Sequence, residues 1–334
     1  MVRKINLSNN CSIIIPCIKF NSEVKKCINE CLKQKKINVK IFVVSDFKLN
    51  KKINSKKIKY LNYGKIHMSE KRNKAVSLSK DKYIAFIDSD AYPTKEWIYN
   101  AIKLLKKNSK IHMVTGPDLP FPNQKGWSYD IGLAHKSFLL SGSKVFRKNI
   151  KGETFVSQAS SCNMVLRKNI YQKVGGMNQK IYIGEDIDLC DKFSKHGKII
   201  YSPFVKIFHK SRDLIPFIKQ RYAYGTCIDH IFSRGVFLNN IQYLVPLFIT
   251  LYIFLLPLFQ LFDQLKYLYN LSFIIFNFII FSEVIRISLN PIRIIKVFFI
   301  VYLGFILFGL GSLFKFLGLT KNIKQIYTSH NKNI

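Results

Sequence analysis

Acidic residues are scarce in this 334-residue chain, which has 19 Asp and Glu against 53 Lys and Arg and a formal net charge of +34. Such an excess of positive charge is typical of proteins that bind nucleic acid or an anionic membrane surface. No nucleic-acid recognition motif accompanies the charge, and Lys, Ile and Asn are abundant throughout, as an AT-biased coding sequence would give. We therefore expect no nucleic-acid partner.

Cysteine pairs at metal-binding spacing are missing as well. The seven cysteines include no CxxC pair and no histidine partner at zinc-ligand spacing, and their odd number fits a reducing cytoplasm. A signal peptide is not visible, because residues 1–10 are polar and the next apolar run covers only residues 13–15. We expect the soluble part of the protein to stay on the cytoplasmic side.

The chain does contain, in its first part, short apolar runs that alternate with amphipathic helical stretches. The expected strands are 12–16, 39–44, 60–63, 83–87 and 111–114, and the expected helices are 22–34, 69–79 and one from Trp97. Strands and helices of this length in alternation build a doubly wound α/β domain with a mostly parallel sheet.

Two carboxylates follow the buried strand at residues 83–87. Parallel sheets bind ligands beyond the carboxyl ends of their strands, and residues i and i+2 of an extended chain point the same way, so Asp88 and Asp90 are aimed at one spot. Paired carboxylates suit Mg²⁺ or Mn²⁺, which would hold a diphosphate. Alternatively, Asp88-Ser89-Asp90 only turns the chain and caps a helix that begins near Thr94.

The first part of the chain resembles the nucleotide-binding half of family 2 glycosyltransferases with the GT-A fold. The resemblance rests on the order and spacing of four motifs, Ser12-Ile-Ile-Ile-Pro16, Val43-Val44-Ser45-Asp46, Lys71-Arg72-Asn73-Lys74-Ala75 and Phe86-Ile87-Asp88-Ser89-Asp90. It implies that Asp46 lies by the nucleobase and that Asp88 and Asp90 hold the metal and the sugar diphosphate. The implied donor-binding set is Pro16, Asp46, Arg72, Asn73, Asp88, Ser89 and Asp90.

Residues 160–190 resemble the acceptor half of the same fold. The motifs are Ser160-Ser161-Cys162-Asn163, Val174-Gly175-Gly176-Met177 and Gly184-Glu185-Asp186-Ile187-Asp188. The resemblance implies a catalytic base at Asp186, next to Glu185, and acceptor binding by Cys162, Asn163, Gly176 and Met177. For Asp186 and Asp188 the alternative is a favourable interaction with the positive end of a helix dipole.

Strands at 197–201 and 205–209 are expected to complete the sheet. His209 stands where many relatives carry a histidine able to meet the metal or the diphosphate, although a histidine after a strand can be purely structural. The predicted metal ligands are therefore Asp88, Asp90 and His209, and the predicted cofactor is Mg²⁺ or Mn²⁺. Residues 116–152 show no clear period and are predicted to be loop and variable insert.

Residues 214–237 mix apolar and basic side chains, which predicts a helix lying along a membrane surface. The stretch from Gln220 to Thr226 resembles the segment after the catalytic domain of membrane-bound family 2 enzymes, but it departs from the Gln-x-x-Arg-Trp motif of processive synthases. Export of a polysaccharide is correspondingly less expected. Arg221 is predicted either to pair with the leaving diphosphate or to be an exposed cation that faces lipid phosphate.

The chain becomes strongly apolar after Asn240. Residues 241–262, 267–289 and 297–319 each meet the ~20-residue length that a membrane-spanning helix needs. The short connections predict antiparallel packing, Glu283 and Arg286 are expected to pair, and close helix contact is expected at the glycines, Gly304, Gly309, Gly311 and Gly318. Three spans would put the basic tail outside, against the positive-inside rule, unless one segment is re-entrant.

The resemblance implies a GT-A catalytic domain at 1–210, with a nucleotide-sugar half (1–115) and an acceptor half (116–210). An amphipathic interfacial helix (211–238), about three transmembrane helices (239–319) and a basic tail (320–334) follow. The expected function is inverting transfer from a nucleotide-diphosphate sugar to a lipid-linked saccharide or polyprenyl phosphate, at the cytoplasmic face of the inner membrane, in cell-surface glycan synthesis.

Two other classes of protein stay open. A sugar nucleotidyltransferase would want a glycine-rich phosphate loop near the first strand and no membrane anchor, and the sequence meets neither condition. A catalytically silent membrane scaffold on the same fold would have little need for Asp88, Asp90 and Asp186 together. The oligomeric state is not predicted.

Overall fold

The computed structural model describes residues 10–48, 53–142, 144, 150–228 and 243–320. The chain packs as two compact units. The first consists of Met1–Phe121 and Lys144–Lys210, and the second consists of Pro122–Ser143 and Ser211–Ile334. The predicted boundary at 210 separates the two, but residues 122–143, which were assigned to the catalytic domain, belong to the second unit.

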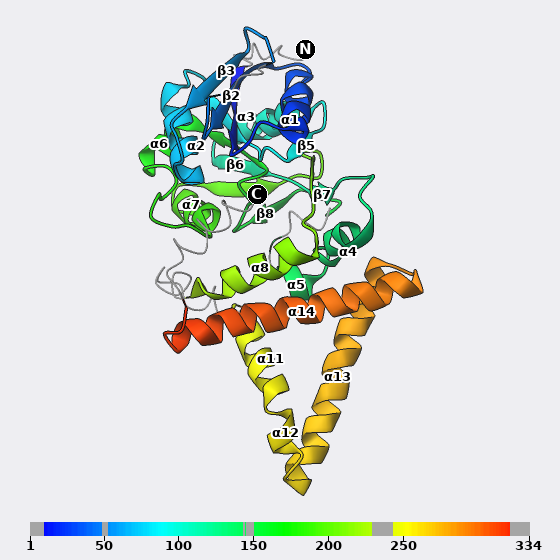
Figure 1. Cartoon of the computed structure of the whole chain (residues 1–334). Coiled ribbons are helices and arrows are strands. Elements are labelled where there is room, and N and C mark those ends of the chain that lie inside the picture. Colours follow the sequence, from blue (N-terminus) through cyan, green and yellow to red (C-terminus); the bar gives the residue numbers. More distant parts are fainter. Residues whose placement is uncertain (1–9, 49–52, 143, 145–149, 229–242, 321–334) are drawn as a thin grey trace. The chain divides into compact units, whose positions relative to one another are not determined.

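The first unit is built on an eight-stranded sheet (Figure 1). Its strands are β1 (Asn10–Cys17), β2 (Asn38–Ser45), β3 (Ile58–Asn62), β4 (Tyr83–Phe86), β6 (Ile111–Thr115), β8 (Thr154–Val156), β9 (Met164–Arg167) and β10 (Lys198–Tyr201). The order is β3-β2-β1-β4-β9-β6-β10-β8, with β8 and β9 antiparallel to their neighbours and the other pairs parallel. The predicted mostly parallel α/β sheet is confirmed.

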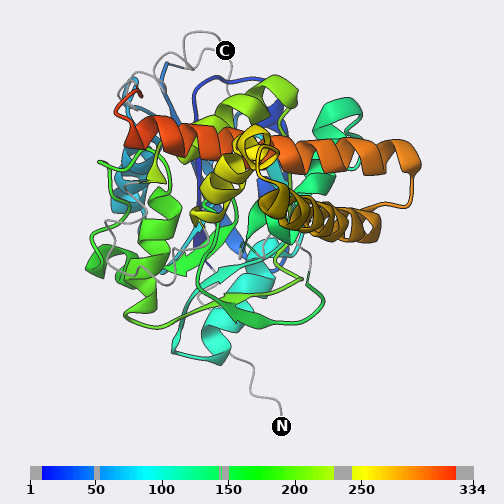
Figure 2. The ribbon, with the colours of Figure 1, turned by 90° about the horizontal axis from the view of Figure 1, so that it is seen from below.

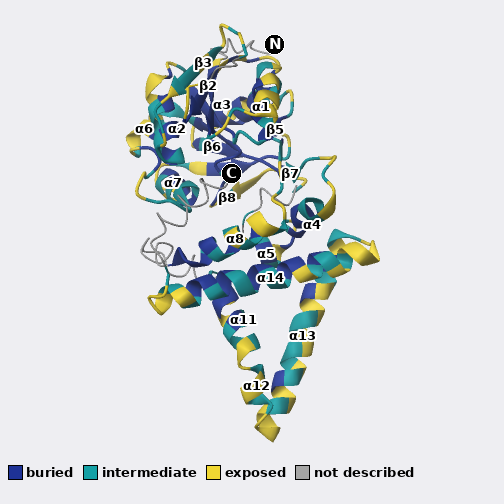
Figure 3. Ribbon diagram, viewed as in Figure 1, coloured by how far each residue is buried: buried dark blue, intermediate teal, exposed yellow. Residues whose placement is uncertain are grey.

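Helices cover both faces of this sheet, which is why its central strands are apolar on both sides. The helices are α1 (Ser22–Leu32), α2 (Met68–Leu78), α3 (Trp97–Lys107), α6 (Lys168–Lys173) and α7 (Glu185–Ser194). Buried residues of α1 and α3 form one core cluster with the sheet, and buried residues of α2, α6 and α7 form another. Figure 3 shows the central strands in the colour of buried residues.

A second, three-stranded sheet has the order β5-β11-β7 and consists of β5 (Ala91–Pro93), β7 (Asp118–Pro120) and β11 (Ile207–His209). The prediction that residues 205–209 complete the main sheet is wrong. Strand β11 pairs instead with β5, which begins directly after Asp90, and with β7, so that His209 faces Ala91 and Ile207 faces Asp118 in the ladder.

The segment 116–152, predicted to be loop and insert, contains regular structure. It holds β7 and two short helices, α4 (Gly126–Ala134) and α5 (Phe138–Ser141). Both helices contribute to the apolar core of the second unit through Ile131, Leu133, Ala134 and Leu140. The prediction failed there because helix α4 is held by tertiary burial of neighbouring positions, which leaves no helical period in its sequence.

The other helices of the second unit are α8 (Leu214–Gly225), α11 (Val245–Phe254), α12 (Leu256–Phe259), α13 (Asp263–Ile287) and α14 (Pro291–Phe316). Helix α8 ends well before the predicted end of the interfacial helix, whose residues 229–238 lie outside the described part. The predicted tail lies outside it too, apart from Thr320.

Among the described residues, two helices rather than three are long and apolar enough to cross a membrane, α13 and α14. The first predicted span is divided between α11 and α12. Pro257 lies in the first turn of α12 and cannot donate a backbone hydrogen bond, so the helix is interrupted there.

The sequence predicted antiparallel packing of α13 and α14, and the C-terminal half of α13 does pack against the first half of α14, where the Tyr302 hydroxyl donates to Asn277 Oδ1. The rest of α14 leaves α13. Helix α14 runs across one end of the hairpin formed by α11, α12 and α13 (Figure 1, Figure 2) and packs along α8. Glycines make these crossings possible: a Cβ at Gly311 would lie 2.3 Å from the Tyr222 carbonyl oxygen, and one at Gly309 would lie 2.0 Å from Thr250 Oγ1.

Close contact is thereby confirmed at Gly309 and Gly311, and also at Gly304, where a Cβ would lie 2.3 Å from Leu140 Cδ1. The prediction is wrong for Gly318, which has a φ of +70° and whose would-be Cβ has no atom of the described residues within 4 Å.

The carboxylate of Glu283, on α13, does not pair with Arg286. It accepts hydrogen bonds from Ser137 Oγ at 2.6 Å and from the Phe138 backbone N–H. These donors stand at the start of α5, where an acid satisfies free N–H groups. The sequence could not reveal this pairing, because about 145 positions separate the partners.

Candidate active site

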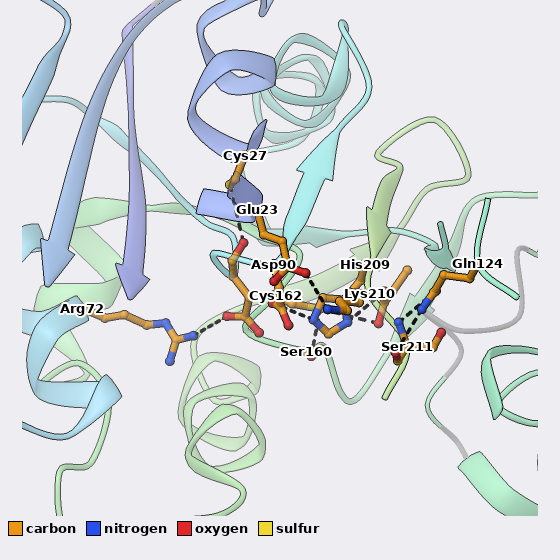
Figure 4. Close-up of polar contacts among 12 residues, drawn as sticks. Glu23, Cys27, Arg72, Asp90, Gln124, Ser160, Cys162, His209, Lys210 and Ser211 are labelled. Atoms are coloured by element: carbon orange, nitrogen blue, oxygen red, sulfur yellow. Dashed lines mark hydrogen bonds and ion pairs between the residues drawn. The ribbon is translucent and has the colours of Figure 1, made fainter. Parts of the chain in front are cut away.

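Asp88 and Asp90 lie in the short link between β4 and β5, at the edge of the main sheet, and His209 ends the neighbouring strand β11. His209 Nε2 is 3.2 Å from Asp90 Oδ1 (Figure 4). One ligand atom each from Asp88, Asp90 and His209 lie within 4.8 Å of one another. The three predicted metal ligands therefore converge.

The alternative that this segment caps the next helix is wrong. The N-cap residue of α3 is Glu96, and neither Asp88 nor Asp90 caps that helix. The partly buried Ser89 stands between the two acids. Two carboxylates and one imidazole form a donor set that fits a divalent cation such as Mg²⁺ or Mn²⁺, the imidazole favouring Mn²⁺ of the two.

Burial lowers the pKa of His209, but the carboxylates of Asp90 and Asp118 outweigh that effect and raise the pKa to about 9. The second carboxylate faces the other ring nitrogen, with Asp118 Oδ1 3.6 Å from Nδ1. His209 therefore lies between two acids on neighbouring strands. A cation that binds the ring must compete with a proton, since only neutral imidazole is a ligand.

Arg72, from α2, connects the two halves of the site. Its guanidinium donates to Asp88 Oδ1 at 2.8 Å and lies 3.7 Å from Glu185 Oε1. The Arg72 side chain is buried, so its charge is only weakly screened. Figure 4 shows Arg72 pointing towards the cluster. Arg72 thus brings a strand-end acid, Asp88, and an acid of the Gly184–Asp188 segment, Glu185, to one guanidinium.

Helix α7 begins with Glu185 and Asp186, after Gly184 with a φ of +85°. Burial raises the pKa of Glu185 to about 7, with a further rise from Asp186 and an opposing effect of Arg72. Asp186 Oδ1 accepts from the Ile187 backbone N–H at 2.9 Å. Asp188 forms an i,i+4 ion pair with Lys192 at 2.8 Å. All three acids lie in the first turn, where the helix dipole favours negative charge.

Asn73 contacts the turn formed by Gly176 and Met177, two of the predicted acceptor-binding residues. Its amide donates to the Met177 carbonyl at 2.8 Å and accepts from the Met177 N–H at 3.1 Å and from the Tyr171 hydroxyl. Gly176 is required there, since it has a φ of +70° and a Cβ would lie 2.7 Å from Asn73 Oδ1. In the structure this side chain therefore holds the glycine turn; its contact with the donor stays a prediction.

Pro16 and Asp46 lie at the ends of β1 and β2, the former opposite Val44 in the ladder. Asp46 is ion-paired with the buried Lys71, which also donates to the Cys17 carbonyl at 2.9 Å. The sequence argument missed Lys71, although it stands in the quoted motif with Arg72. A buried lysine can be found from sequence only if its acidic partner is known.

Cys162 and Asn163 are almost fully buried. Asn163 accepts from Trp97 Nε1 at 2.8 Å and donates to the Val205 carbonyl at 2.9 Å. The Cys162 thiol lies 3.6 Å from Asp118 Oδ2. Their surroundings are those of core residues, and contact with an acceptor stays a prediction. Asp118 was not singled out from the sequence, where no strand-end pattern marks it.

Arg221 belongs to the second unit, on α8. Its side chain is buried and donates to the carbonyl oxygens of Gly304 at 3.3 Å and Leu140 at 3.4 Å. The alternative that it is an exposed cation facing lipid phosphate is wrong. Its pairing with a leaving diphosphate stays a prediction.

A mostly parallel, helix-covered sheet with acids at its edge is the architecture of the GT-A fold. Residues 12–175 match the family model "Glycosyl transferase family 2". Residues 12–175 therefore form a domain of the family 2 glycosyltransferases.

Two kinds of curated relative are similar to this chain. The poly(ribitol-phosphate) beta-glucosyltransferase of Bacillus spizizenii is 25% identical over 235 residues, which cover 62% of this chain and 36% of the relative. The pre-mycofactocin glycosyltransferase of Mycobacterium tuberculosis is 23% identical over 163 residues, which cover 46% of this chain and 32% of the relative. The alignments thus span about a third of each relative's length.

Proposed function

We propose that the protein is an inverting glycosyltransferase that moves a sugar from a nucleoside-diphosphate sugar to a membrane-associated acceptor. The observation that carries this proposal is the convergence of Asp88, Asp90 and His209 within 4.8 Å, next to Arg72 and the acids of α7. The relatives support it, because both are named as glycosyltransferases. A role in cell-surface glycan synthesis is part of the proposal.

Asp88, Asp90 and His209 are the proposed ligands of Mg²⁺ or Mn²⁺, with Arg72 fixing the Asp88 carboxylate. A cation bound there supplies positive charge where the diphosphate leaving group becomes negative. The structure supports a fixed arrangement, because Arg72 is buried and His209 is tied to β5 by the strand ladder.

Asp186 is the proposed general base that takes the proton from an acceptor hydroxyl. Its position in the first turn of α7 supports this role, since Glu185 beside it is near the ion pair of Arg72 and Asp88. A single base implies a single displacement, which inverts the anomeric centre. Asp46 and Asn73 are proposed to contribute to donor binding, and the turn at Gly176 and Met177 to acceptor binding.

Calorimetric and thermal screening of nucleotide sugars tests the proposal on the whole chain in detergent. Ligand at about 100 times its Kd stabilises a protein by about 2.7 kcal/mol, which corresponds to a rise in Tm of about 5 to 10 °C for a domain of this size. We expect that rise with a nucleotide sugar plus Mn²⁺, and not with the same compound plus EDTA.

A turnover assay with the stabilising sugar separates the enzyme from a silent scaffold on the same fold. Formation of nucleoside diphosphate supports the proposal, whereas binding without turnover over a set of lipid acceptors contradicts it. Formation of a nucleotide sugar from a sugar phosphate and a nucleoside triphosphate would instead identify a nucleotidyltransferase.

The hairpin of α11, α12 and α13 is the proposed membrane insertion, with the catalytic unit on the cytoplasmic side of the inner membrane. Only 17% of the most apolar 18-residue stretch of helix α13 is buried in the protein (Figure 3). Its exposed large side chains include Leu268, Leu271, Ile274 and Phe278. Such a surface favours hydrocarbon over water.

Helix α14 is proposed to lie along the membrane surface rather than across it. Half of the most apolar 18-residue stretch of α14 is buried in the protein. Charged side chains contact α14 near its start and near its middle. Lys296 Nζ lies 3.4 Å from Asp130 Oδ2, and the Gly304 carbonyl accepts a hydrogen bond from Arg221. A crossing α14 would draw Asp130 and Arg221 into hydrocarbon, which costs about 3 kcal/mol each on insertion scales.

This topology predicts that the basic tail lies on the same side as the loop before α14. A cysteine placed at Gln264, at the far end of the hairpin, is expected to react with an impermeant maleimide from outside. Cysteines at Asn290 and after Thr320 are expected to react only after permeabilisation. The native cysteines in the described residues are all buried, so we expect little maleimide labelling of the protein without an added cysteine. Labelling of the tail from outside would indicate three crossings instead.

A further inference from the structure

Asp118 lies next to the metal-site histidine on the side opposite Asp90. It begins strand β7, which pairs with β11 so that Asp118 faces Ile207, two residues before His209. Its side chain is 3% exposed, and Oδ1 is 3.6 Å from His209 Nδ1. Buried carboxylates are costly unless paired, and this one faces the imidazole ring.

The two ring nitrogens of His209 have different neighbours. Nε2 faces Asp90, and Nδ1 faces Asp118. When a histidine binds a metal through one nitrogen, the other carries a proton, and a carboxylate that accepts a hydrogen bond from this N–H group fixes both the tautomer and the ring orientation. The distance of 3.6 Å between Asp118 Oδ1 and His209 Nδ1 is that of an ion pair and is longer than a hydrogen bond, so the proposed hydrogen bond requires a shorter contact than the one in this structure.

We propose that Asp118 is a positioning residue, which accepts a hydrogen bond from Nδ1–H of His209 and so directs Nε2 to a cation held by Asp88 and Asp90. This inference rests on the proposed metal site. Asp118 needs no contact with the donor or the acceptor, because it acts only through His209.

A neighbouring group, Asp118, Cys162 and His209, also brings ligand atoms within 4.8 Å of one another. That group includes a thiol, which suits softer metals than Mg²⁺ or Mn²⁺. Its thiol lies 3.3 Å from Ser160 Oγ and 3.6 Å from Asp118 Oδ2. A metal site at Asp118, Cys162 and His209 would require Cys162, whereas a site at Asp88, Asp90 and His209 would not.

Binding of Mn²⁺ alone to the full-length protein in detergent tests the inference. Asp118→Ala is expected to weaken the Mn²⁺ Kd about 10- to 100-fold, the usual effect of losing such a partner. Asp118→Asn keeps an oxygen acceptor and is expected to lose less. Electron spin resonance should detect ¹⁴N coupling from His209 in the wild type and a weaker coupling in Asp118→Ala.

A double-mutant cycle separates positioning from a general structural effect. In a His209→Ala background, Asp118→Ala is expected to change the Mn²⁺ Kd no further, because its effect passes through the ring. Additive effects would overturn the inference. So would wild-type affinity and ¹⁴N coupling in Asp118→Ala.

Two further variants complete the test. Cys162→Ala should bind Mn²⁺ normally, and a loss equal to that of Asp118→Ala would move the site to the thiol group. Asp81→Asn is the matched control, since this acid of the same unit accepts from Ser12 Oγ away from the cluster and should leave binding unchanged. If Asp118→Ala fails to fold, Asp118→Asn and its cycle with His209→Ala decide the question.

Discussion

Asp90→Ala is expected to abolish donor binding and to lower kcat/KM by about 10³-fold. The change removes one of the two carboxylates that converge with His209, and it also removes the group that faces His209 Nε2. With the cation site lost, Arg72 would be the positive charge still paired with Asp88, and it would have to offset both that carboxylate and the diphosphate. Electrostatic repulsion would then oppose binding instead of favouring it.

Isothermal titration calorimetry with a nucleoside diphosphate and Mn²⁺ measures this effect. The wild-type protein should bind, and both Asp90→Ala and wild-type protein with EDTA should show no heat of binding. Glu96→Ala is the control, because Glu96 lies at the start of α3 in an exposed ion pair with Lys36. If Asp90→Ala binds the diphosphate with unchanged affinity and metal dependence, the proposed metal site is wrong.

Asp186→Asn is expected to act differently on two kinds of acceptor. A hydroxyl acceptor must lose a proton as it attacks, and loss of a general base typically costs about 10² to 10⁴ in rate. A phosphate acceptor arrives already ionised and needs little help from a base. The variant should therefore nearly abolish transfer to a sugar hydroxyl but only impair transfer to a lipid phosphate.

Asp188→Asn provides a control from the same helical turn. Asp188 is paired with Lys192 and shares with Asp186 the favourable interaction with the helix dipole. Rates should be measured with both acceptor types in all three proteins, together with the Kd for donor. Full activity of Asp186→Asn on a hydroxyl acceptor, or an equal loss in Asp188→Asn, would contradict the assignment of Asp186.

Arg72 links the acids at the end of β4 with those at the start of α7. It is buried, donates to Asp88 and lies beside Glu185, so that one fixed positive charge joins acids separated by about 100 positions in the chain. A buried charge of this kind is stable only when its partners are in place. This arrangement supports the proposal that the metal ligands and the general base belong to one preorganised site.

Much of the first unit follows from local sequence patterns. The apolar runs that became β1, β2, β4 and β6 are flanked by helices of amphipathic period, and α1 begins where Asn21 accepts from the Val24 N–H. The acids after β4 could be predicted as a site because strand direction and side-chain alternation are properties of the backbone. His209 could be predicted as a metal ligand only through the resemblance to family 2 glycosyltransferases.

Apart from the span that Pro257 divides, the main errors of prediction concern contacts between distant segments. Short strands such as β7 and β11 have too few residues to show a period, and Asp118 faces His209 only because β5, β7 and β11 pair. Helix α4 and the partners of Glu283 were missed for the same reason.

By itself the sequence determined the alternation of strands and helices, the family, the acids at the sheet edge and the apolar nature of the C-terminal region. Only the tertiary structure decided that Asp118 flanks His209, that Arg72 connects Asp88 with Glu185 and that α14 packs along α8. The physical reason is that periodicity and strand-end chemistry are local, whereas these pairings depend on segments far apart in the chain. Hydropathy measures aversion to water, and it is equal for a helix that lies in lipid and one that is buried in protein.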